Sequence, residues 1–336
     1  MRYVKVAFKQ AEKVKKQLFE LEVFDKRYTI LKDDGFVYFP VIKKVKNFTI
    51  VNKKAEKKSI KLTLEQILKG KLNKKELGLL TKAFDIIGDI AILEIEEELL
   101  SKKKVIADAV LKVNKNVNTV VRKVGEHKGK YRIQDCEYLA GEKRFETLHK
   151  ESGVSVKLDV RKVYFSPRLS NERLRVSSLV KPGEEVLVMF SGVGIYPFVI
   201  AKYGKAKEIY GVEINPVACK YADENIIINK AKNIKLFCGD VAKVGPKLNK
   251  KFDRIIMPLP KESTSFLDLA FKVLKRNGII HLYCFSAEEG IQDIIELIKK
   301  KCNCEVISLV KCGQQSPRIW RYCIDFRFLE PIESFI

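Results

Sequence analysis

The chain has 336 residues, which is enough for two or three domains of ordinary size. Hydrophobic residues make up 46% of it and no run of about eighteen apolar residues occurs, so the composition argues against wholesale disorder and against a membrane span. Lysine and arginine number 65 against 42 acidic residues, a net charge of +23 that predicts a polyanionic partner such as a nucleic acid.

The first 52 residues are predicted to form a small domain of their own. Ala11–Leu21 places apolar residues on one helical face, and Phe36–Val41 reads as a strand that contains a proline near its end. Residues 53–60 are polar and mostly charged, which is typical of a linker. We therefore expect domain 1–52 to move relative to the rest of the chain on this basic linker.

Residues 61–165 carry a mixed pattern that predicts a middle α+β domain. Leu62–Lys69 and Ala107–Lys123 are expected to be helical, and Asp85–Glu94 is apolar and β-branched enough for one strand. Beyond residue 130 the pattern returns to strands. These are expected at Tyr131–Ile133, Phe145–His149 and Val154–Leu158.

From about residue 180 onward, short apolar runs alternate with helical stretches. The clearest helix is Ile291–Lys301, where isoleucine recurs at intervals of three and four residues. Such alternation predicts a parallel sheet with helices on both faces, and hence an α/β domain over residues 166–336. The expected strands are Glu185–Phe190, Glu208–Val212, Ile234–Phe237, Arg254–Met257 and Ile279–Phe285, followed by an edge hairpin of Glu305–Val310 and Arg321–Phe328.

The cysteines and the first residues of the chain suggest a reducing compartment. Cys302 and Cys304 form C-x-C rather than the C-x-x-C spacing of zinc sites, so we expect reduced thiols and no bound metal. The start, Met1–Lys5, has no apolar segment of the signal-peptide kind, which predicts a cytoplasmic protein.

Four motifs stand at the ends of consecutive predicted strands, where open α/β folds bind nucleotides. Phe190–Gly194 ends in Gly-x-Gly, and glycine lets the backbone approach a ligand closely. Glu213 can accept hydrogen bonds from both hydroxyls of a ribose. Asp240 can bind the amino group of adenine, and Met257–Lys261 forms a proline-rigidified loop.

Each motif is weak alone, since Gly-x-Gly is often a structural turn and Glu213 could cap the helix that Asn215 and Pro216 open. Together and in this order they resemble the Rossmann-like, seven-stranded class I fold of S-adenosylmethionine-dependent methyltransferases. A nicotinamide dehydrogenase is the competing interpretation. It requires G-x-G-x-x-G, and Pro197 stands at the third position.

Two upstream segments make the resemblance narrower. Tyr138–Arg144, and Val163–Arg173 with its F-S-P-R-L followed by E-R, resemble hallmark segments of the archaeal and eukaryotic tRNA (guanine-37-N1)-methyltransferases. The similarity runs from about Arg132 to the C-terminus. It implies S-adenosylmethionine as cofactor and tRNA as partner, with domain 1–52 on the tRNA body and the other domains on the anticodon loop. We expect a monomer with no obligate protein partner.

Residue by residue, the resemblance implies Glu172 as general base and Arg132 as the arginine near guanine O6. Methylation at N1 requires its proton to leave, and a positioned carboxylate can accelerate that step roughly 100- to 10,000-fold. Charge then grows on O6, where a guanidinium stabilises it. The plainer alternatives are a solvated helix start for Glu172 and a strand-face charge for Arg132. Substrate-binding residues are expected at Arg168, Pro258 and Lys261, and cofactor-binding residues at Arg173, Phe190, Gly192, Gly194, Glu213, Ile214, Asp240 and Val241.

Three departures from the family pattern bear on the acceptor. Val188 stands where an acid is usual, Gly192–Phe198 stretches the usual G-V-G-P-F, and Met257 stands where an asparagine usually helps to hold the target base. These loops resemble the archaeal branch of wyosine synthesis. Two acceptors therefore stay open: guanine N1, which leads, and C7 of 4-demethylwyosine, alone or in addition. Aminocarboxypropyl transfer and a non-catalytic RNA-binding module are further alternatives.

Overall fold

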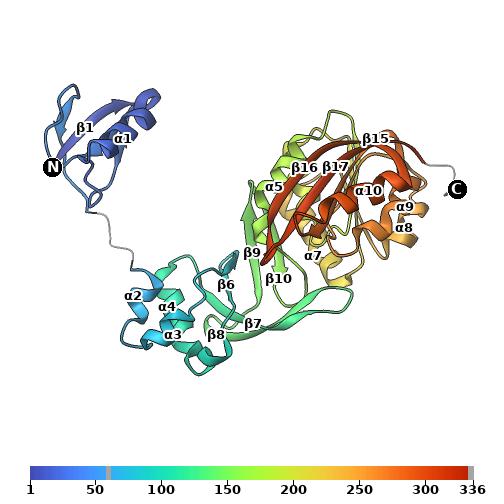
Figure 1. Ribbon diagram of the computed structural model, residues 1–336, viewed down its shortest axis with the longest axis horizontal. Coiled ribbons are helices and arrows are strands. Elements are labelled where there is room, and N and C mark those ends of the chain that lie inside the picture. The colour runs from blue at the N-terminus through green and yellow to red at the C-terminus, as the bar shows by residue number, and fades with distance from the viewer. Residues whose placement is uncertain (58–61, 332–336) are drawn as a thin grey trace. The chain divides into compact units, whose positions relative to one another are not determined.

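The computed structural model describes residues 1–57 and 62–331 (Figure 1). The chain divides into two compact units, Met1–Thr63 and Leu64–Ile336. Among the described residues, no helix is long and apolar enough to cross a membrane.

The first unit is an antiparallel sheet of order β2-β3-β1-β4 packed against one helix. Its elements are β1 (Arg2–Ala7), η1 (Phe8–Gln10), α1 (Ala11–Glu20), β2 (Leu31–Asp33), β3 (Phe36–Pro40) and β4 (Ile50–Asn52). The apolar face of α1 buries Val14 and Leu18, as its spacing predicts. The predicted linker starts too early, because the Lys53 amide donates to the Met1 carbonyl and the Thr29 amide to the Glu56 carbonyl. Residues 53–57 therefore run along this unit, and 58–60 lie outside the described residues.

The second unit begins with the predicted middle α+β layer, a sheet of order β5-β6-β7-β8. Its elements are α2 (Leu64–Leu68), α3 (Lys74–Gly78), β5 (Asp85–Ile87), β6 (Ile90–Leu93), η2 (Glu97–Lys102), α4 (Lys103–Val113), β7 (Thr119–Lys128) and β8 (Ile133–Gly141). Two expectations are wrong here. The single strand 85–94 is a hairpin, because Gly88 takes a φ of +59° and turns the chain. The single helix 107–123 ends at Val113, because Asn114 leaves helical geometry and the chain enters β7.

The rest of the chain forms a seven-stranded sheet of order β13-β12-β11-β14-β15-β17-β16. Its strands are β11 (Glu185–Met189), β12 (Glu208–Glu213), β13 (Ile234–Cys238), β14 (Phe252–Met257), β15 (Leu274–Ser286), β16 (Cys302–Ser316) and β17 (Ile319–Pro331). The first five are parallel, and β17 is antiparallel to both β15 and β16. This confirms the predicted parallel sheet and its edge hairpin, whose strands are the red elements of Figure 1.

Helices cover both faces of this sheet. They are α5 (Ser170–Ser178), α6 (Ile195–Tyr203) and α7 (Pro216–Asn229) on one face, and α8 (Val241–Lys247), α9 (Leu267–Val273) and α10 (Ile291–Lys301) on the other. Side chains alternate along each strand, so neighbouring residues enter different cores. Ile256 packs toward α5–α7 and Met257 toward α8–α10. Whether a residue stands at an even or an odd position of its strand therefore decides against which set of helices its side chain packs.

The hairpin of β9 (Glu146–Glu151) and β10 (Val154–Asp159) is a two-stranded sheet that packs against both the seven-stranded sheet and the middle layer. Val156 and Leu158 share a core with Val186 of β11. Two asparagines of α7 also bind its backbone, with Asn225 Oδ1 2.7 Å from the Lys157 amide and Asn229 Oδ1 at 2.9 Å from that of Ser155. The hairpin therefore joins the two layers, and the domain boundary expected at residue 165 stays a prediction.

Candidate active site

The loop between β11 and α6 brings backbone close to the carboxyl edge of the sheet. Gly194, which precedes α6, has a φ of +88°, and a Cβ there would lie 2.6 Å from the ring of Phe198. Only glycine fits both constraints. Gly192 also has a positive φ, and Phe190 packs edge-on against Phe266 with ring centroids 4.9 Å apart. Of the residues of this turn, Gly192 is half-buried while Val193 and Gly194 are buried, so Gly192 is the part that a ligand could contact.

Glu213 lies beside this loop, at the end of β12. Its Oε2 accepts the Gly192 amide at 2.8 Å and its Oε1 accepts the Asn215 amide at 2.8 Å. Burial raises the pKa of the Glu213 carboxyl, and these backbone hydrogen bonds counter that effect. The Ile214 amide also hydrogen-bonds to this carboxylate, so about one of its four acceptor positions is left for a ribose hydroxyl.

The helix cap that could have explained Glu213 is supplied by a different residue. Asn215 Oδ1 accepts the Val217 amide at the start of α7, so Asn215 and not Glu213 caps that helix. The carboxylate instead joins the glycine loop to the end of β12. This geometry fits the ribose-binding role expected of Glu213.

Asp240 and Val241 follow β13 at the same edge. Asp240 Oδ1 accepts the Ala242 amide at 2.9 Å and so caps α8. The Val241 side chain is buried in the core under α8. Ile214 is half-buried beside Glu213. Their contacts with a cofactor stay predictions.

Glu172 lies in the first turn of α5 and is only 7% exposed, so it is not a solvated helix start. Its Oε1 accepts the Tyr283 hydroxyl and Arg175 Nη2, both at 2.7 Å, and its Oε2 accepts Arg175 Nε at 2.7 Å. Burial raises the pKa of the Tyr283 phenol, so this hydroxyl stays protonated and donates. The carboxylate is thus fixed in one orientation.

The loop after β14 is joined to the strand that carries Tyr283. The Phe285 amide donates to the Pro260 carbonyl at 3.3 Å. Pro258 is half-buried in this loop and Lys261 is exposed. The loop and Glu172 are thereby attached to the same stretch of β15.

Met257 does not stand where a side chain could hold a target base. It is 0% exposed and packs toward α8–α10, whereas Tyr283 packs toward α5–α7. An asparagine at 257 would be buried in that apolar core on the far side of the sheet. The expectation placed on residue 257 is therefore wrong, and Pro258 is the first residue of the loop that reaches the surface.

Arg132 reaches the same loop from the middle layer. It lies in the turn between β7 and β8 with a φ of +51°, and its side chain is 20% exposed. Its Nη2 is 3.8 Å from Glu262 Oε1, next to Lys261. The strand expected at 131–133 is wrong, because residues 129–132 form a turn. Arg132 therefore does not lie on the face of a strand, and its side chain points toward the loop after β14.

Two predicted site arginines are engaged in other contacts. Arg173 is buried, and its Nε and Nη2 each lie 2.5 Å from an oxygen of Glu151 on β9, so its planar fork is occupied. Arg168 is 60% exposed and its Nε donates to Asp85 on β5 at 2.7 Å, a hydrogen bond that raises the pKa of Arg168. Their roles at cofactor and substrate stay predictions, and Arg168 is the more accessible of the two.

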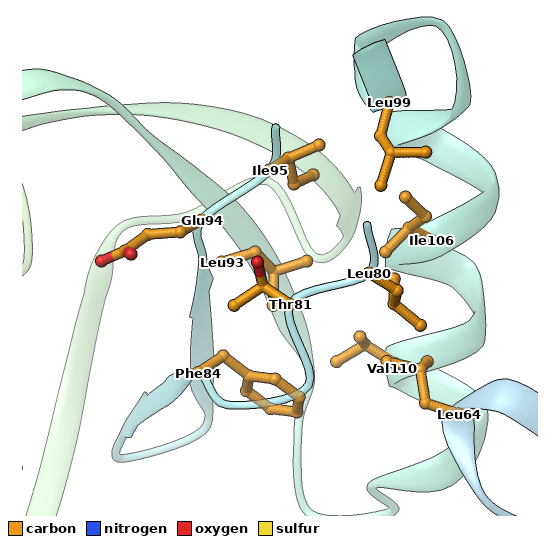
Figure 2. Close-up of a pocket in the computed structure, with 10 residues that line it drawn as sticks. All are labelled: Leu64, Leu80, Thr81, Phe84, Leu93, Glu94, Ile95, Leu99, Ile106 and Val110. Atoms are coloured by element: carbon orange, nitrogen blue, oxygen red, sulfur yellow. The ribbon is translucent and has the colours of Figure 1, made fainter. Parts of the chain in front are cut away.

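A small pocket in the middle layer is separate from these residues (Figure 2). Its wall is apolar apart from Thr81 and Glu94, and the Glu94 carboxylate points away from it. The leucine and isoleucine side chains around it, such as Leu93 and Ile106, belong to the core of that layer. The predicted site residues do not line it, and it is a gap in core packing rather than a second ligand site.

Sequence reasoning missed the partners of Glu172. Arg175 lies three residues further along the same helix, where side chains meet. Asp325 shares the otherwise apolar stretch Tyr322–Phe328 with Arg327, and His281 stands alone in Ile279–Phe285. A charged residue in a central strand must find a buried partner, so these positions did carry a signal.

Comparison with known proteins agrees with this geometry. Models of the TRM5/TYW2 methyltransferase domain, the TYW2 N-terminal domain and the tRNA methyltransferase 5 N-terminal domain match residues 147–308, 64–144 and 4–49. The chain is 39% identical over 338 residues to the tRNA (guanine(37)-N(1))-methyltransferase Trm5b of Pyrococcus abyssi, which covers 96% of this chain and 98% of that protein.

Two further similarities bear on the acceptor and on RNA. The chain is 33% identical over 267 residues to the tRNA (guanine(37)-N(1))/4-demethylwyosine(37)-methyltransferase Taw22 of Nanoarchaeum equitans, covering 64% of this chain and 88% of that relative. The solved complex of aTrm5 and tRNALeu matches with a TM-score of 0.73 and 32% identity, over 98% of this chain and 100% of that one. The chain is therefore an enzyme with the class I methyltransferase fold, and it belongs to the TRM5/TYW2 family.

Proposed function

We propose that this enzyme transfers a methyl group from S-adenosylmethionine to N1 of the guanine at position 37 of tRNA, in the cytoplasm. The observation that carries the proposal is the meeting of two distant segments at one loop. Glu172 is attached through Tyr283 to β15, which holds the 258–262 loop, and Arg132 Nη2 lies 3.8 Å from Glu262 Oε1 in that loop. The name of the 39%-identical relative and the net charge of +23 support tRNA as the substrate.

The cofactor site is assigned to the glycine loop and the acids at the strand ends. Glu213 has about one acceptor position left for a ribose hydroxyl, and the backbone at Gly192 can lie against the rest of the molecule. When bound, S-adenosylmethionine supplies an electrophilic methyl group. The protein then has to present the acceptor and remove its proton.

Glu172 is suited to take that proton. A carboxylate offers about four acceptor positions, and the Tyr283 and Arg175 hydrogen bonds occupy three of those on Glu172. The Cys312 thiol also hydrogen-bonds to this carboxylate, so the N1–H of guanine would take the position of that weak donor. As that proton leaves, negative charge grows on O6, and Arg132 provides a guanidinium on the other side of the loop to stabilise it.

A second acceptor, C7 of 4-demethylwyosine, is favoured by one observation. Pro258 offers no hydrogen-bonding side chain at the start of the loop, so it does not select the edge of an unmodified guanine. The relative from Nanoarchaeum equitans is named for both activities. Methylation at C7 also requires a proton to leave, so Glu172 would keep its role.

The test is to identify the methylated nucleoside. The enzyme is incubated with isotopically labelled S-adenosylmethionine and either an unmodified tRNA transcript with guanine at position 37 or a tRNA that carries 4-demethylwyosine there. Digestion and mass spectrometry should find N1-methylguanosine from the first, and a transcript with adenine at position 37 should stay unlabelled. Label on the tricyclic base alone would replace the first acceptor by the second, and label on neither tRNA would contradict the proposal.

A further inference from the structure

The base proposed above is one end of a buried chain of charged and polar groups that crosses three strands. Arg175 Nη1 donates to Asp325 Oδ2 at 2.7 Å, while Nη2 lies 2.7 Å from Glu172 Oε1 and 3.4 Å from Asp325 Oδ1. One guanidinium is therefore shared by two carboxylates. All of these groups face the α5–α7 side of the sheet, together with Tyr283.

Asp325 is held firmly by its other partners. Its Oδ1 accepts His281 Nδ1 at 2.6 Å, and its Oδ2 accepts the Ser308 hydroxyl at 2.7 Å. Burial opposes its ionisation, but the hydrogen bonds from His281 and Arg175 outweigh it and keep the pKa of Asp325 far below its usual range. The residue is a fixed negative charge at the pH of the cell.

His281 extends the chain toward Arg254. Arg254 Nη1 lies 2.7 Å from His281 Nε2, and because arginine can only donate, Nε2 is the acceptor and Nδ1 carries the proton given to Asp325. Burial lowers the pKa of His281, which keeps the ring neutral. The charge of Arg254 is balanced by Glu184, because Arg254 Nε donates to Glu184 Oε2 at 2.7 Å.

Three further titratable groups around Glu172 are neutral, and two guanidinium groups lie beside them, Arg173 next to Tyr196 and Arg321 next to Cys312. Burial raises the pKa of Cys312 on β16, of Cys323 on β17 and of Tyr196 on α6. Arg175 is the charged group that hydrogen-bonds to Glu172, with Asp325 behind it, whereas Arg173 is paired with Glu151. Guanidinium groups flank His281, Cys323 and Asp325, which makes that cluster unsuitable for a metal ion.

A carboxylate in a two-pronged pair with arginine is well oriented but is a weak base, because the pairing stabilises its anion. A second carboxylate on the same guanidinium weakens that stabilisation. We propose that Asp325 is a positioning residue for the methyl transfer, which holds Arg175 in place and, by sharing it, keeps Glu172 able to accept a proton. The inference rests on the role of Glu172 in the proposed function.

The test is the pH dependence of the single-turnover rate in Asp325→Asn, which keeps the shape and removes the charge. Glu172 then faces Arg175 alone and loses its proton more readily. The pH of half-maximal rate should fall by about 1 pH unit, and the plateau rate should fall about three- to tenfold because the base is weaker. The affinity for S-adenosylmethionine should be unchanged. A wild-type midpoint and plateau would overturn the inference.

Two further variants keep this test sharp. Glu305→Gln removes a carboxylate of β16 that pairs with Arg327 at the surface, and it should leave the pH profile unchanged. Arg175→Lys keeps the charge but lacks the fork, so the anion of Glu172 is stabilised less and the midpoint should rise. The plateau should still fall, because the carboxylate is no longer held in one orientation. This variant serves even if Asp325→Asn does not fold. A wild-type profile for Arg175→Lys would also overturn the inference.

Glu172→Gln separates a failure of this inference from a failure of the proposed function. If that variant is slow while Asp325→Asn behaves as the wild type, only the role of Asp325 is wrong. If Glu172→Gln itself keeps the wild-type rate, the proposed role of Glu172 is wrong and Asp325 has no base to position.

Discussion

The cofactor edge and the acceptor side of this enzyme are built in different ways. At the cofactor edge, polar groups are held by backbone within a few residues or one strand away, as Glu213 is by Gly192 and Asn215. On the acceptor side, side chains from distant segments hold one another, as Tyr283 holds Glu172 and Glu262 approaches Arg132. We infer from this difference that the first region binds the cofactor and the second carries out the methyl transfer. Substitutions in the first should change cofactor affinity, and substitutions in the second should change the rate.

The largest effect is expected at Glu172. Glu172→Gln keeps the shape and most hydrogen bonds but removes the base, so the single-turnover rate should fall roughly 100-fold or more while both ligands still bind. Rapid-quench measurement with excess enzyme gives this rate. A wild-type rate would exclude Glu172 as the base. Asp253 could not replace it, because Asp253 lies at the amino end of β14 and binds Lys275 at 2.9 Å.

The second largest effect on the rate is expected at Arg132. Arg132→Ala removes a guanidinium expected to stabilise charge on O6, a charge-assisted hydrogen bond worth about 1.5–3 kcal/mol, so the rate should fall about 10- to 150-fold at saturating tRNA. Lys128→Ala is the matched control, because Lys128 lies on the same hairpin and pairs with Asp135 in solvent. Equal losses in the two variants would mean that Arg132 acts only through general positive charge.

Substitution of Glu213 should weaken binding of the cofactor and leave the affinity for tRNA unchanged. Glu213→Ala should weaken S-adenosylmethionine binding by about 1.5–3 kcal/mol in calorimetry, because a charge-assisted hydrogen bond to the ribose is removed. Glu208→Gln is the control, since Glu208 lies at the opposite end of the same strand and pairs with Lys235 and Lys250. Unchanged cofactor affinity in Glu213→Ala would remove that residue from the site.

Removal of the N-terminal unit should have the mildest effect on chemistry. The unit has its own core, and residues 53–57 belong to it, so the cut should follow Thr63 rather than residue 52. Cofactor affinity should be unchanged and tRNA affinity weaker. The slope of log affinity against log salt should become shallower by roughly 0.7–0.9 for each tRNA phosphate that the unit neutralises. An unchanged affinity and slope would show that this unit does not bind tRNA.

The same contrast explains what could be predicted from the sequence. The cofactor edge follows from strand ends and glycines that are contiguous in the chain, so Gly194 and Glu213 could be named from spacing. Spacing could not identify the partners of Glu172, which are Tyr283, Arg175 and Asp325. Their contacts depend on the order of the strands in the sheet and on the face of the sheet to which each side chain points. Met257 illustrates that gap, since its motif position was right for the loop but its side chain faces the other core.

The division between binding and chemistry is tested most directly by one single-turnover experiment in which the S-adenosylmethionine concentration is raised to saturation. Glu213→Ala and Glu172→Gln are compared with the wild type across cofactor concentrations. The account predicts that excess cofactor restores most of the rate of Glu213→Ala, whereas Glu172→Gln stays roughly 100-fold slow at every concentration. A Glu172→Gln variant that recovers its rate with added cofactor would contradict the assignment of Glu172 to the chemical step.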